Sequence, residues 1–309
     1  MSIQVVPPGT ETQPVSSTPN DNGGLNIVGQ PGDDRLPGST GPDNIATTTG
    51  NDLVGAGGGD DRVLLGPGND TAAGGTGIDS IQGNEGNDSI TGGNGDDSLR
   101  GGKDNDTVEG DEGADIIFGD RGDDVVSGGI GDDTVLGNAG NDVVIGGPGN
   151  DNLDGGKDDD SLSGGIGDDT LSGARGNDTL TGGAGADDFF FWFSTDGSYG
   201  IDSLTDFNRG EGDKIVLAAN FPVPEDAAFN ALTGTPTGSE LSEEQFDVIS
   251  GFNPVTQGNS SAAIIYDPNE GLVYYNPTTL AGDEVAFARV DNTVYDADNP
   301  LQNTDFEIF

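Results

Sequence analysis

The sequence contains no histidine and no cysteine among its 309 residues, and it has one methionine and one tryptophan. Catalysis that needs a histidine base or a cysteine nucleophile is therefore excluded. The usual His and Cys sites for zinc, haem and iron–sulfur clusters are excluded for the same reason. No disulfide can form, so an extracellular fold would need another means of stabilisation.

Basic residues are also scarce, because ten Lys and Arg accompany 56 Asp and Glu and leave a formal net charge of −46. Nucleic acids and anionic membrane surfaces bind proteins through Lys and Arg, so neither is expected as a partner. No apolar run approaches the ~18 residues of a membrane span. No apolar segment of a secretory signal peptide precedes Arg35, the first basic residue. The abundant ligand is carboxylate oxygen, which hard cations such as calcium prefer.

A nine-residue repeat runs without insertion or deletion from Gly29 to Phe190, giving eighteen nonapeptides. Glycine occupies position one in fifteen repeats and position four in sixteen, and position five is Asp or Asn in fourteen. Position eight is a large apolar residue in seventeen, with Ala72 as the exception. Position six is always aspartate: Asp34, Asp43, Asp52, Asp61, Asp70, Asp79, Asp88, Asp97, Asp106, Asp115, Asp124, Asp133, Asp142, Asp151, Asp160, Asp169, Asp178 and Asp187. A composition rich in glycine and acid is typical of disorder, but disorder does not explain this constant phase.

Each repeat position has a physical role. Glycines at positions one, two and four allow positive φ in a tight turn and leave main-chain carbonyls uncovered. The last three residues predict a short strand, with position eight directed inward and positions seven and nine outward. One nonapeptide cannot bury its single apolar side chain, so two repeats are expected to form one coil, and successive coils to pair as parallel strands.

This reasoning predicts an all-β fold, a parallel β-roll of about nine coils over residues 29–190. Stacked turns bring carbonyls and aspartates together as oxygen cages, with room for up to about sixteen Ca²⁺ ions. The repeats carry 34 acids and seven bases, so the metal-free columns would repel one another. We therefore expect the metal-free protein to be unfolded and metal binding to supply folding energy.

The consensus resembles the calcium-binding nonapeptide of the RTX (repeats-in-toxin) family, most clearly in Gly164-Gly165-Ile166-Gly167-Asp168-Asp169-Thr170-Leu171-Ser172. The resemblance implies a parallel β-roll, calcium ligation by turn carbonyls and the position-six aspartates, and secretion through a type I exporter. Carried over by position, the eighteen aspartates named above are the implied metal ligands. Thr47, Ala56 and Leu65 replace glycine at position one, so weaker calcium binding is expected in the N-terminal coils.

The two ends of the chain differ from the repeats. Residues 1–28, which contain four prolines, are expected to be a disordered lead-in. Residues 191–309 are expected to form a small, mainly antiparallel β cap and to include a type I secretion signal region. The aromatic run Phe189 to Phe193 predicts a hydrophobic plug for the roll.

Within the cap, the segment 200–215 resembles the one that closes the roll of serralysin-type proteases, whose zinc motif is absent here. Asp202 and Asp206 are explained equally well as ligands of a capping ion and as turn residues. A short helix is expected over 239–249. A hairpin over 264–275 and a strand over 285–290 are expected after it.

The chain ends in Asp305-Phe306-Glu307-Ile308-Phe309, which resembles the uncleaved C-terminal signal of type I substrates. The sequence therefore favours a secreted, extracellular calcium-binding protein without catalytic activity, which folds after export and is a substrate of a type I exporter. The main alternative is a structural or adhesive component of a cell surface or matrix, with an unknown partner. An acid-pair enzyme that uses Glu240, Glu243 and Glu244 is a third hypothesis, disfavoured because no domain large enough for a sugar cleft remains.

Overall fold

The computed structural model describes residues 16–192, 199–217, 239–240, 246–248, 264–267, 271–275, 285–290, 301–302 and 305–308. The described residues contain no α-helix. They form the predicted all-β fold, a parallel β-solenoid of about nine turns followed by a small group of antiparallel strands. The chain divides into two compact units, residues 1–153 and 154–309, and each is described by itself.

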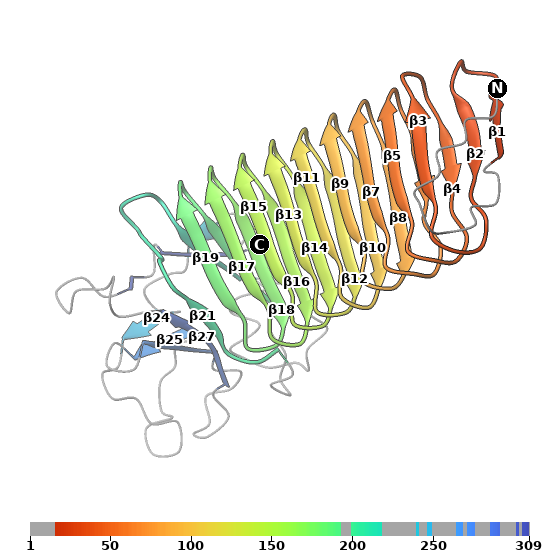
Figure 1. Ribbon diagram of the computed structural model, residues 1–309. Coiled ribbons are helices and arrows are strands. Elements are labelled where there is room, and N and C mark those ends of the chain that lie inside the picture. Colours follow the sequence, from red (N-terminus) through yellow and green to blue (C-terminus); the bar gives the residue numbers. More distant parts are fainter. Residues whose placement is uncertain are drawn as a thin grey trace. The chain divides into compact units, whose positions relative to one another are not determined.

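In the first unit the even-numbered and odd-numbered strands lie in two separate sheets (Figure 1). The first sheet contains β1 (Ser16–Pro19), β2 (Leu25–Val28), β4 (Asn44–Ala46), β6 (Arg62–Leu64), β8 (Ser80–Glu85), β10 (Ser98–Lys103), β12 (Ile116–Arg121) and β14 (Thr134–Ala139). The second contains β3 (Arg35–Ser39), β5 (Leu53–Gly58), β7 (Thr71–Thr76), β9 (Ser89–Asn94), β11 (Thr107–Glu112), β13 (Val125–Ile130) and β15 (Val143–Pro148). Leu99 pairs with Ile81 on one side and Ile117 on the other, each eighteen residues away, so two nonapeptides make one coil as predicted.

The second unit continues the alternation after β16 (Asn152–Lys157), which spans the boundary between the units. One sheet contains β17 (Ser161–Ile166), β19 (Thr179–Ala184), β21 (Asp202–Leu204), β27 (Val285–Val290), β26 (Leu272–Tyr275), β25 (Ile264–Asp267) and β24 (Phe246–Val248). The other contains β18 (Thr170–Arg175), β20 (Asp188–Phe191), β22 (Lys214–Leu217), β28 (Phe306–Ile308) and β23 (Ser239–Glu240). Parallel pairing continues through β21 to β27 and through β22 to β28, whereas β25, β26 and β27 pair antiparallel.

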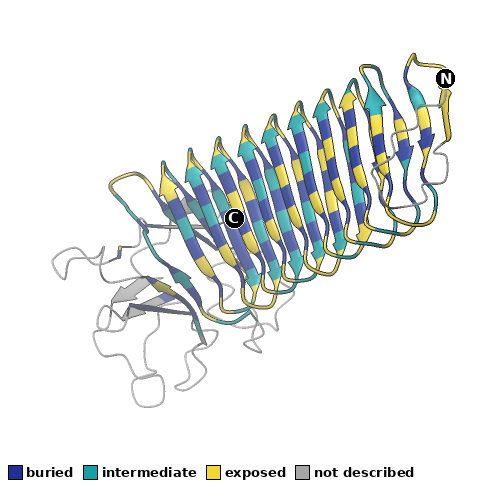
Figure 2. Ribbon diagram, in the orientation of Figure 1, coloured by how far each residue is buried: buried dark blue, intermediate teal, exposed yellow. Residues whose placement is uncertain are grey.

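The three-residue strand predicted from the repeat is present in β4 and β6, but the other strands of the repeats are longer. Strand β9 covers positions seven, eight and nine of one nonapeptide and then positions one, two and three of the next. Both Ile90, at position eight, and Gly92, at position one, are buried, and this alternation recurs along the described strands (Figure 2). The prediction was wrong because glycine is generally unfavourable in strands, whereas here its missing side chain suits the crowded interior.

The glycines of one repeat serve two different purposes. Positive φ occurs at position two, as in Gly93 (118°), and at position four, as in Gly95 (130°). Position-one glycines such as Gly92 do not have it, contrary to the prediction for that position. Asp104 and Asp158, which replace glycine at position four, adopt φ of 71° and 73°, a left-handed conformation that aspartate tolerates better than most residues.

The N-terminal boundary of the ordered fold precedes the predicted one. Residues 1–28 were expected to be disordered, but β1 and β2 form an antiparallel pair, and β2 pairs in parallel with β4. Ile27 is buried and lies in register with Ile45, so it acts as a position-eight residue before the first regular nonapeptide. Residues 1–15 lie outside the described residues.

The C-terminal expectations are confirmed for the hairpin and for the strand over 285–290. The helix expected over 239–249 is wrong, because β23 pairs with β28 and β24 pairs with β25. Hydrogen bonding between segments far apart in the sequence here outweighs the local preference for a helix. Residues 241–245 and 249 lie outside the described residues, and no described residue belongs to a helix able to cross a membrane.

The aromatic run contributes alternate residues to the core of the second unit. Phe189 and Phe191 are buried, and their rings lie 5.9 Å from Phe207 and 5.2 Å from Phe287. Trp192 remains 39% exposed, and Phe193 lies outside the described residues. The run is therefore a two-sided strand, and only its inward side provides the predicted hydrophobic packing.

Candidate metal centre

All eighteen position-six aspartates are buried, with exposed fractions between 1% and 9%. Within each unit they stack in columns, because the main-chain N–H of one aspartate donates to Oδ1 of the aspartate eighteen residues later. The N–H of Asp79 donates to Asp97 Oδ1 at 2.7 Å, and the N–H of Asp97 donates to Asp115 Oδ1 at 2.7 Å. The same bond joins Asp160 to Asp178 in the second unit. The predicted stacking of turns is thus confirmed.

For most of these aspartates, the second carboxylate oxygen, Oδ2, has no hydrogen-bond partner within the described part of the chain. The unpartnered Oδ2 atoms belong to Asp52, Asp61, Asp70, Asp79, Asp88, Asp97, Asp106, Asp115, Asp124, Asp133, Asp178 and Asp187. A buried charged oxygen without a partner is costly unless a cation compensates it. The protein alone therefore leaves these buried carboxylates without a compensating charge, and a bound cation would supply it.

Glycine at position one makes space for this oxygen. A methyl group built on Gly83 would lie 2.3 Å from Asp88 Oδ2 and 2.3 Å from the carbonyl oxygen of Gly101. Gly110 has the same surroundings, with Asp115 Oδ2 at 2.2 Å and the Gly128 carbonyl oxygen at 2.3 Å from the built methyl. A carboxylate oxygen and a carbonyl oxygen from the next coil therefore face one small space beside each of these glycines.

Burial raises the pKa of several interior column aspartates above the usual value of 3.8, as at Asp61, Asp88 and Asp97. The pKa of Asp88 rises to about 7 because of burial, with a smaller lowering by the main-chain hydrogen bond of Asp70 and a smaller raising by the charge of Asp70. The pKa of Asp106 rises to about 8, again chiefly through burial, and the charges of Asp124 and Asp88 add to it. Ionised columns are therefore unfavourable at neutral pH unless positive charge is bound.

The available ligands are all oxygen atoms. No three carboxylates of the described residues form a cluster that could hold a metal by themselves. Each coil instead brings one aspartate to each turn, beside main-chain carbonyls exposed by glycine. Calcium commonly combines carboxylate with backbone carbonyl ligands and takes six to eight oxygens, so these residues fit calcium. The assignment of the eighteen aspartates as its ligands stays a prediction.

The first aspartates of the columns differ from the interior ones. Asp34 Oδ2 accepts the N–H of Gln30 at 2.6 Å, and Asp43 Oδ2 accepts the N–H of Ser39 at 2.5 Å. At the N-terminal end, main-chain N–H groups thus satisfy the Oδ2 atom, which has no partner in the interior aspartates named above. Thr47, Ala56 and Leu65 occupy buried position-one sites in the three nonapeptides that follow, where a glycine would leave space.

Two further aspartates extend the columns beyond the nonapeptides. The N–H of Asp178 donates to Asp202 Oδ1 at 3.1 Å, and the N–H of Asp187 donates to Asp213 Oδ1 at 3.1 Å. The sequence hypothesis had left Asp202 open and had not included Asp213, because their spacings are 24 and 26 residues instead of eighteen. Gly200-Ile201-Asp202-Ser203, which repeats Gly77-Ile78-Asp79-Ser80, was a usable signal for Asp202.

A parallel β-solenoid with buried aspartate columns and glycine-lined turns defines a calcium-binding β-roll. The family described as RTX calcium-binding nonapeptide repeat (4 copies) matches residues 37–72, 73–108, 91–126, 100–135, 109–144, 127–162, 136–171 and 163–197. Together these matches cover residues 37–197, just over half of the chain. The chain belongs to this family and is an RTX calcium-binding β-roll repeat protein. Among curated proteins no significant match is found.

Proposed function

We propose that this β-roll is secreted, folds when it binds many calcium ions outside the cell, and has no catalytic activity of its own. The observation that carries the proposal is the series of buried, unpartnered Oδ2 atoms within the aspartate columns. A divalent cation beside each such oxygen would replace repulsion within the column by attraction. Binding energy would then contribute directly to folding.

The small hydrophobic core supports dependence on metal. Most strands of the repeats bury one large apolar side chain, such as Leu99 or Val108, beside a position-one glycine that adds none. Ordering nine residues of backbone costs roughly 1–2 kcal/mol per residue, more than one buried side chain returns. Stabilisation beyond the core is therefore required, and bound cations at the turns would provide it.

A difference in calcium concentration would make folding directional. Extracellular calcium modules work at about 10⁻⁴–10⁻³ M, well above the range of cytosolic sensors. A chain that binds in this range stays unfolded before export and folds after it. Three features support type I export. The repeats are of the RTX type, residues 200–215 resemble the segment that closes the roll of serralysin-type proteases, and the C-terminal segment is acidic and hydrophobic.

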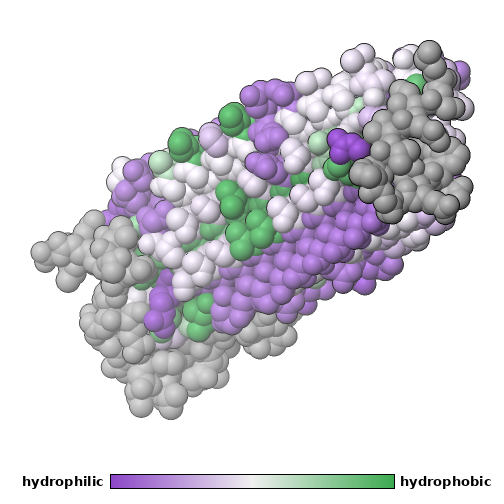
Figure 3. All heavy atoms as spheres, viewed as in Figure 1, coloured by the Kyte–Doolittle hydropathy of each residue, from purple (hydrophilic) through white to green (hydrophobic). Residues whose placement is uncertain are grey.

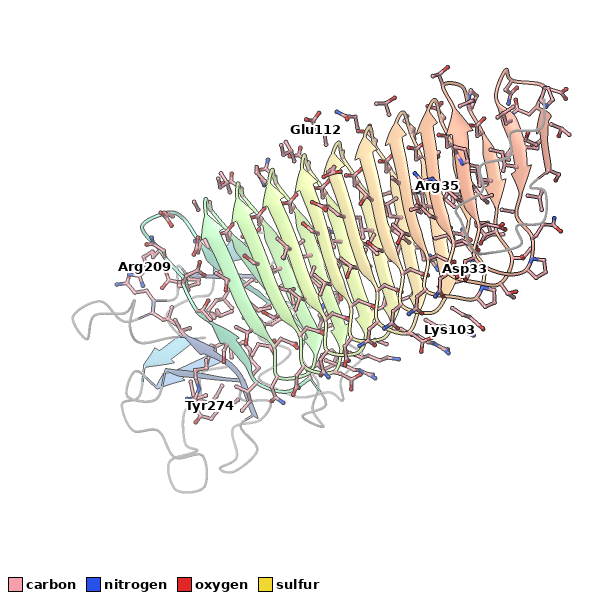
Figure 4. All side chains as sticks on the ribbon, viewed as in Figure 1. Asp33, Arg35, Lys103, Glu112, Arg209 and Tyr274 are labelled. Atoms are coloured by element: carbon pink, nitrogen blue, oxygen red, sulfur yellow. The ribbon has the colours of Figure 1, made fainter. Side chains whose placement is uncertain are left out.

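The C-terminal segment has a structural role within the second unit as well. Strand β28 pairs in parallel with β22, placing Phe306 beside Ile215. Arg209, labelled in Figure 4, donates through Nε to Asp305 Oδ1 at 2.5 Å and also pairs with Oδ2. Asp305 is 1% exposed, so this ion pair holds the start of β28 in place. The proposed secretion signal would be presented to an exporter only before this strand pairs.

The proposal is tested by far-ultraviolet circular dichroism of the full chain during a calcium titration. The titration runs from chelator to about 10 mM, above the working range of extracellular modules, and magnesium serves as the control. We expect a coil spectrum in chelator and a cooperative change to β only with calcium. A β spectrum already present in chelator would refute calcium-dependent folding.

A second candidate function is a structural or adhesive protein of a cell surface or matrix. Val125 and Val143 pair on adjacent strands β13 and β15, and Ile145 lies on the same strand as Val143; these side chains are 37–42% exposed. Figure 3 shows hydrophobic surface on the face formed by the odd-numbered strands. Exposed apolar side chains grouped on adjacent strands of a highly acidic chain suit lateral assembly. Calcium-dependent sedimentation would distinguish an assembling protein from a monomer.

A further inference from the structure

The even-numbered sheet of the first unit carries a basic patch, formed by Arg100, Lys103 and Arg121. These residues lie on the adjacent strands β10 and β12, and all three are exposed. The sequence contains no other Lys or Arg between Arg62 and Lys157. Lys103 and Arg121 are paired in register, and like charges directly opposite each other destabilise a sheet. Positive charge is thus concentrated on two strands of a chain whose net charge is −46.

Acids of the same chain compensate the basic patch only in part. Lys103 pairs with Glu85 at 2.5 Å, and both side chains are 54% exposed. Arg100 pairs with Asp120 at 3.4 Å. Exposed ion pairs of this kind contribute only about 0–1 kcal/mol. Among the described residues no acid pairs with Arg121, so this side chain is free to pair with an acid of another molecule.

Apolar groups accompany the charges on this face. The Cζ atom of Arg100 lies 4.6 Å from the centroid of the Phe118 ring, so the guanidinium is placed over the aromatic ring. Ile116 precedes Phe118 by two residues on β12 and is 46% exposed. Arginine and aromatic side chains are enriched at protein interfaces. The patch therefore has the composition of a surface that contacts another protein.

The odd-numbered sheet carries an acidic patch, formed by Glu109, Asp111 and Glu112 of β11. The repeats contain only one other glutamate, Glu85, and none of the three acids belongs to the aspartate columns. Glu109 is exposed between buried neighbours, and no described residue forms a hydrogen bond or an ion pair with it. Strand β13 pairs with β11 and exposes Val125. This face therefore also combines unpaired charge with apolar surface, but the sign of the charge is opposite.

The two patches lie at the same level of the roll. Strand β11 follows β10 after the turn 104–106 and precedes β12, but it belongs to the other sheet. Arg100 is three residues before the end of β10, and Gly110 is three residues after the start of β11, so both are equally far from the turn that joins the strands. A second copy displaced across the sheets would therefore bring its Arg100 between Glu109 and Asp111 of the first copy.

We propose that copies of the chain stack face to face, with the basic patch of one copy against the acidic patch of the next. This inference deepens the second candidate function, assembly, and it requires the calcium-folded roll of the first. A second copy is the favoured partner because the same chain carries both complementary patches at one level. The contact uses different surfaces on the two copies, so each added copy leaves a free patch and the stack stays open.

The charges predict how this stack depends on the solution. Complementary charges give specificity to a contact, and salt screens them. The net charge of −46 opposes association of the metal-free chain, whereas bound calcium reduces this repulsion. We therefore expect association only in calcium, and we expect sodium chloride to weaken it.

The test compares full-length Arg100→Glu, Glu109→Arg and the double variant by sedimentation velocity in calcium, after circular dichroism has shown that each folds. Like charges brought together cost several kcal/mol, so each single variant should associate at least about tenfold more weakly than the unmodified chain. The double variant should associate again, because its two patches are again complementary. An equimolar mixture of the two single variants should associate for the same reason.

Two comparisons separate this contact from a general effect of charge. Arg35→Glu changes the net charge as Arg100→Glu does, but Arg35 lies on β3, so this variant should associate like the unmodified chain. Glu109→Arg lowers the net negative charge, so general repulsion alone predicts stronger association, whereas the stack predicts weaker association.

The inference fails if the calcium-folded chain stays monomeric, if the single variants associate like the unmodified chain, or if neither the double variant nor the mixture recovers association. In each of these cases calcium-dependent folding, the proposed function, still stands. If circular dichroism shows no folding with calcium, the proposed function fails, and the stack of calcium-folded rolls fails with it.

Discussion

Replacing the position-one glycine Gly83 by alanine tests whether the space beside it is needed by the aspartate column. The added methyl group would lie 2.3 Å from Asp88 Oδ2 and 2.3 Å from the Gly101 carbonyl oxygen. Contact at that distance forces both oxygens to move. Overpacking of a well-packed interior costs typically about 1–3 kcal/mol. Because the displaced oxygens are the ones that face the proposed ion, the cost should appear in calcium-dependent folding.

Gly55→Ala is the matched control, since no atom lies within 4 Å of a methyl group built there and Gly55 also belongs to a strand of the first unit. We expect Gly83→Ala to need more calcium for folding in a titration followed by circular dichroism. Native mass spectrometry should also show at least one fewer bound ion. Gly55→Ala should leave the midpoint nearly unchanged or stabilise the fold by up to about 1 kcal/mol. Equal behaviour of the two variants would refute the role assigned to position one.

Three further predictions concern the core, the charge and the pH response. Leu99→Ala removes a fully buried side chain and should lower the free energy of unfolding in calcium by about 2–5 kcal/mol, measured by urea denaturation; a loss below 1 kcal/mol would contradict the core assignment. Asp106→Asn keeps an acceptor for the Asp88 N–H but removes a buried charge. Mass spectrometry should therefore show fewer bound ions, and the metal-free fold should become more stable at pH 7. An unchanged ion count would contradict the role of Asp106 as a ligand. In chelator, β content should increase as the pH falls from 7 to 5, because the pKa of Asp88 is raised to about 7 in the fold, and the folded state therefore holds protons that the unfolded state has lost. Calcium affinity should fall over the same range because protons compete for the carboxylates. A metal-free fold that becomes less stable on acidification would show that the columns do not carry these raised pKa values.

The nonapeptide phase was sufficient to predict the coil, the two-repeat register and the stacking of position-six aspartates, because each repeat has one inward apolar residue and cannot bury it alone. Strand length was not predictable in the same way. Position one lies inside the solenoid, where Gly92 is buried, yet a glycine carries no hydrophobic signal. Its role depends on the oxygens that approach it, such as Asp97 Oδ2, 2.3 Å from a built methyl group.

The ends of the chain show where local patterns become insufficient. Ile27 lies before the first regular nonapeptide and still enters the core, because β2 pairs with β4. A short helix was expected over 239–249, whereas the described residues of this segment form strands paired with later segments of the chain. In each case pairing between segments far apart in the sequence determined the structure.

The sequence by itself determined the all-β class, the coil of two repeats and the oxygen-rich ligand chemistry, since all three follow from a strict period and from the residue types at positions six and eight. Only the tertiary structure decided how each column ends. Asp202 and Asp213 are both aspartates after a glycine-rich turn, but Asp213 receives two main-chain N–H groups and Asp202 lies against Asp178. That difference depends on which backbone groups the fold brings to each carboxylate, and no local spacing encodes it.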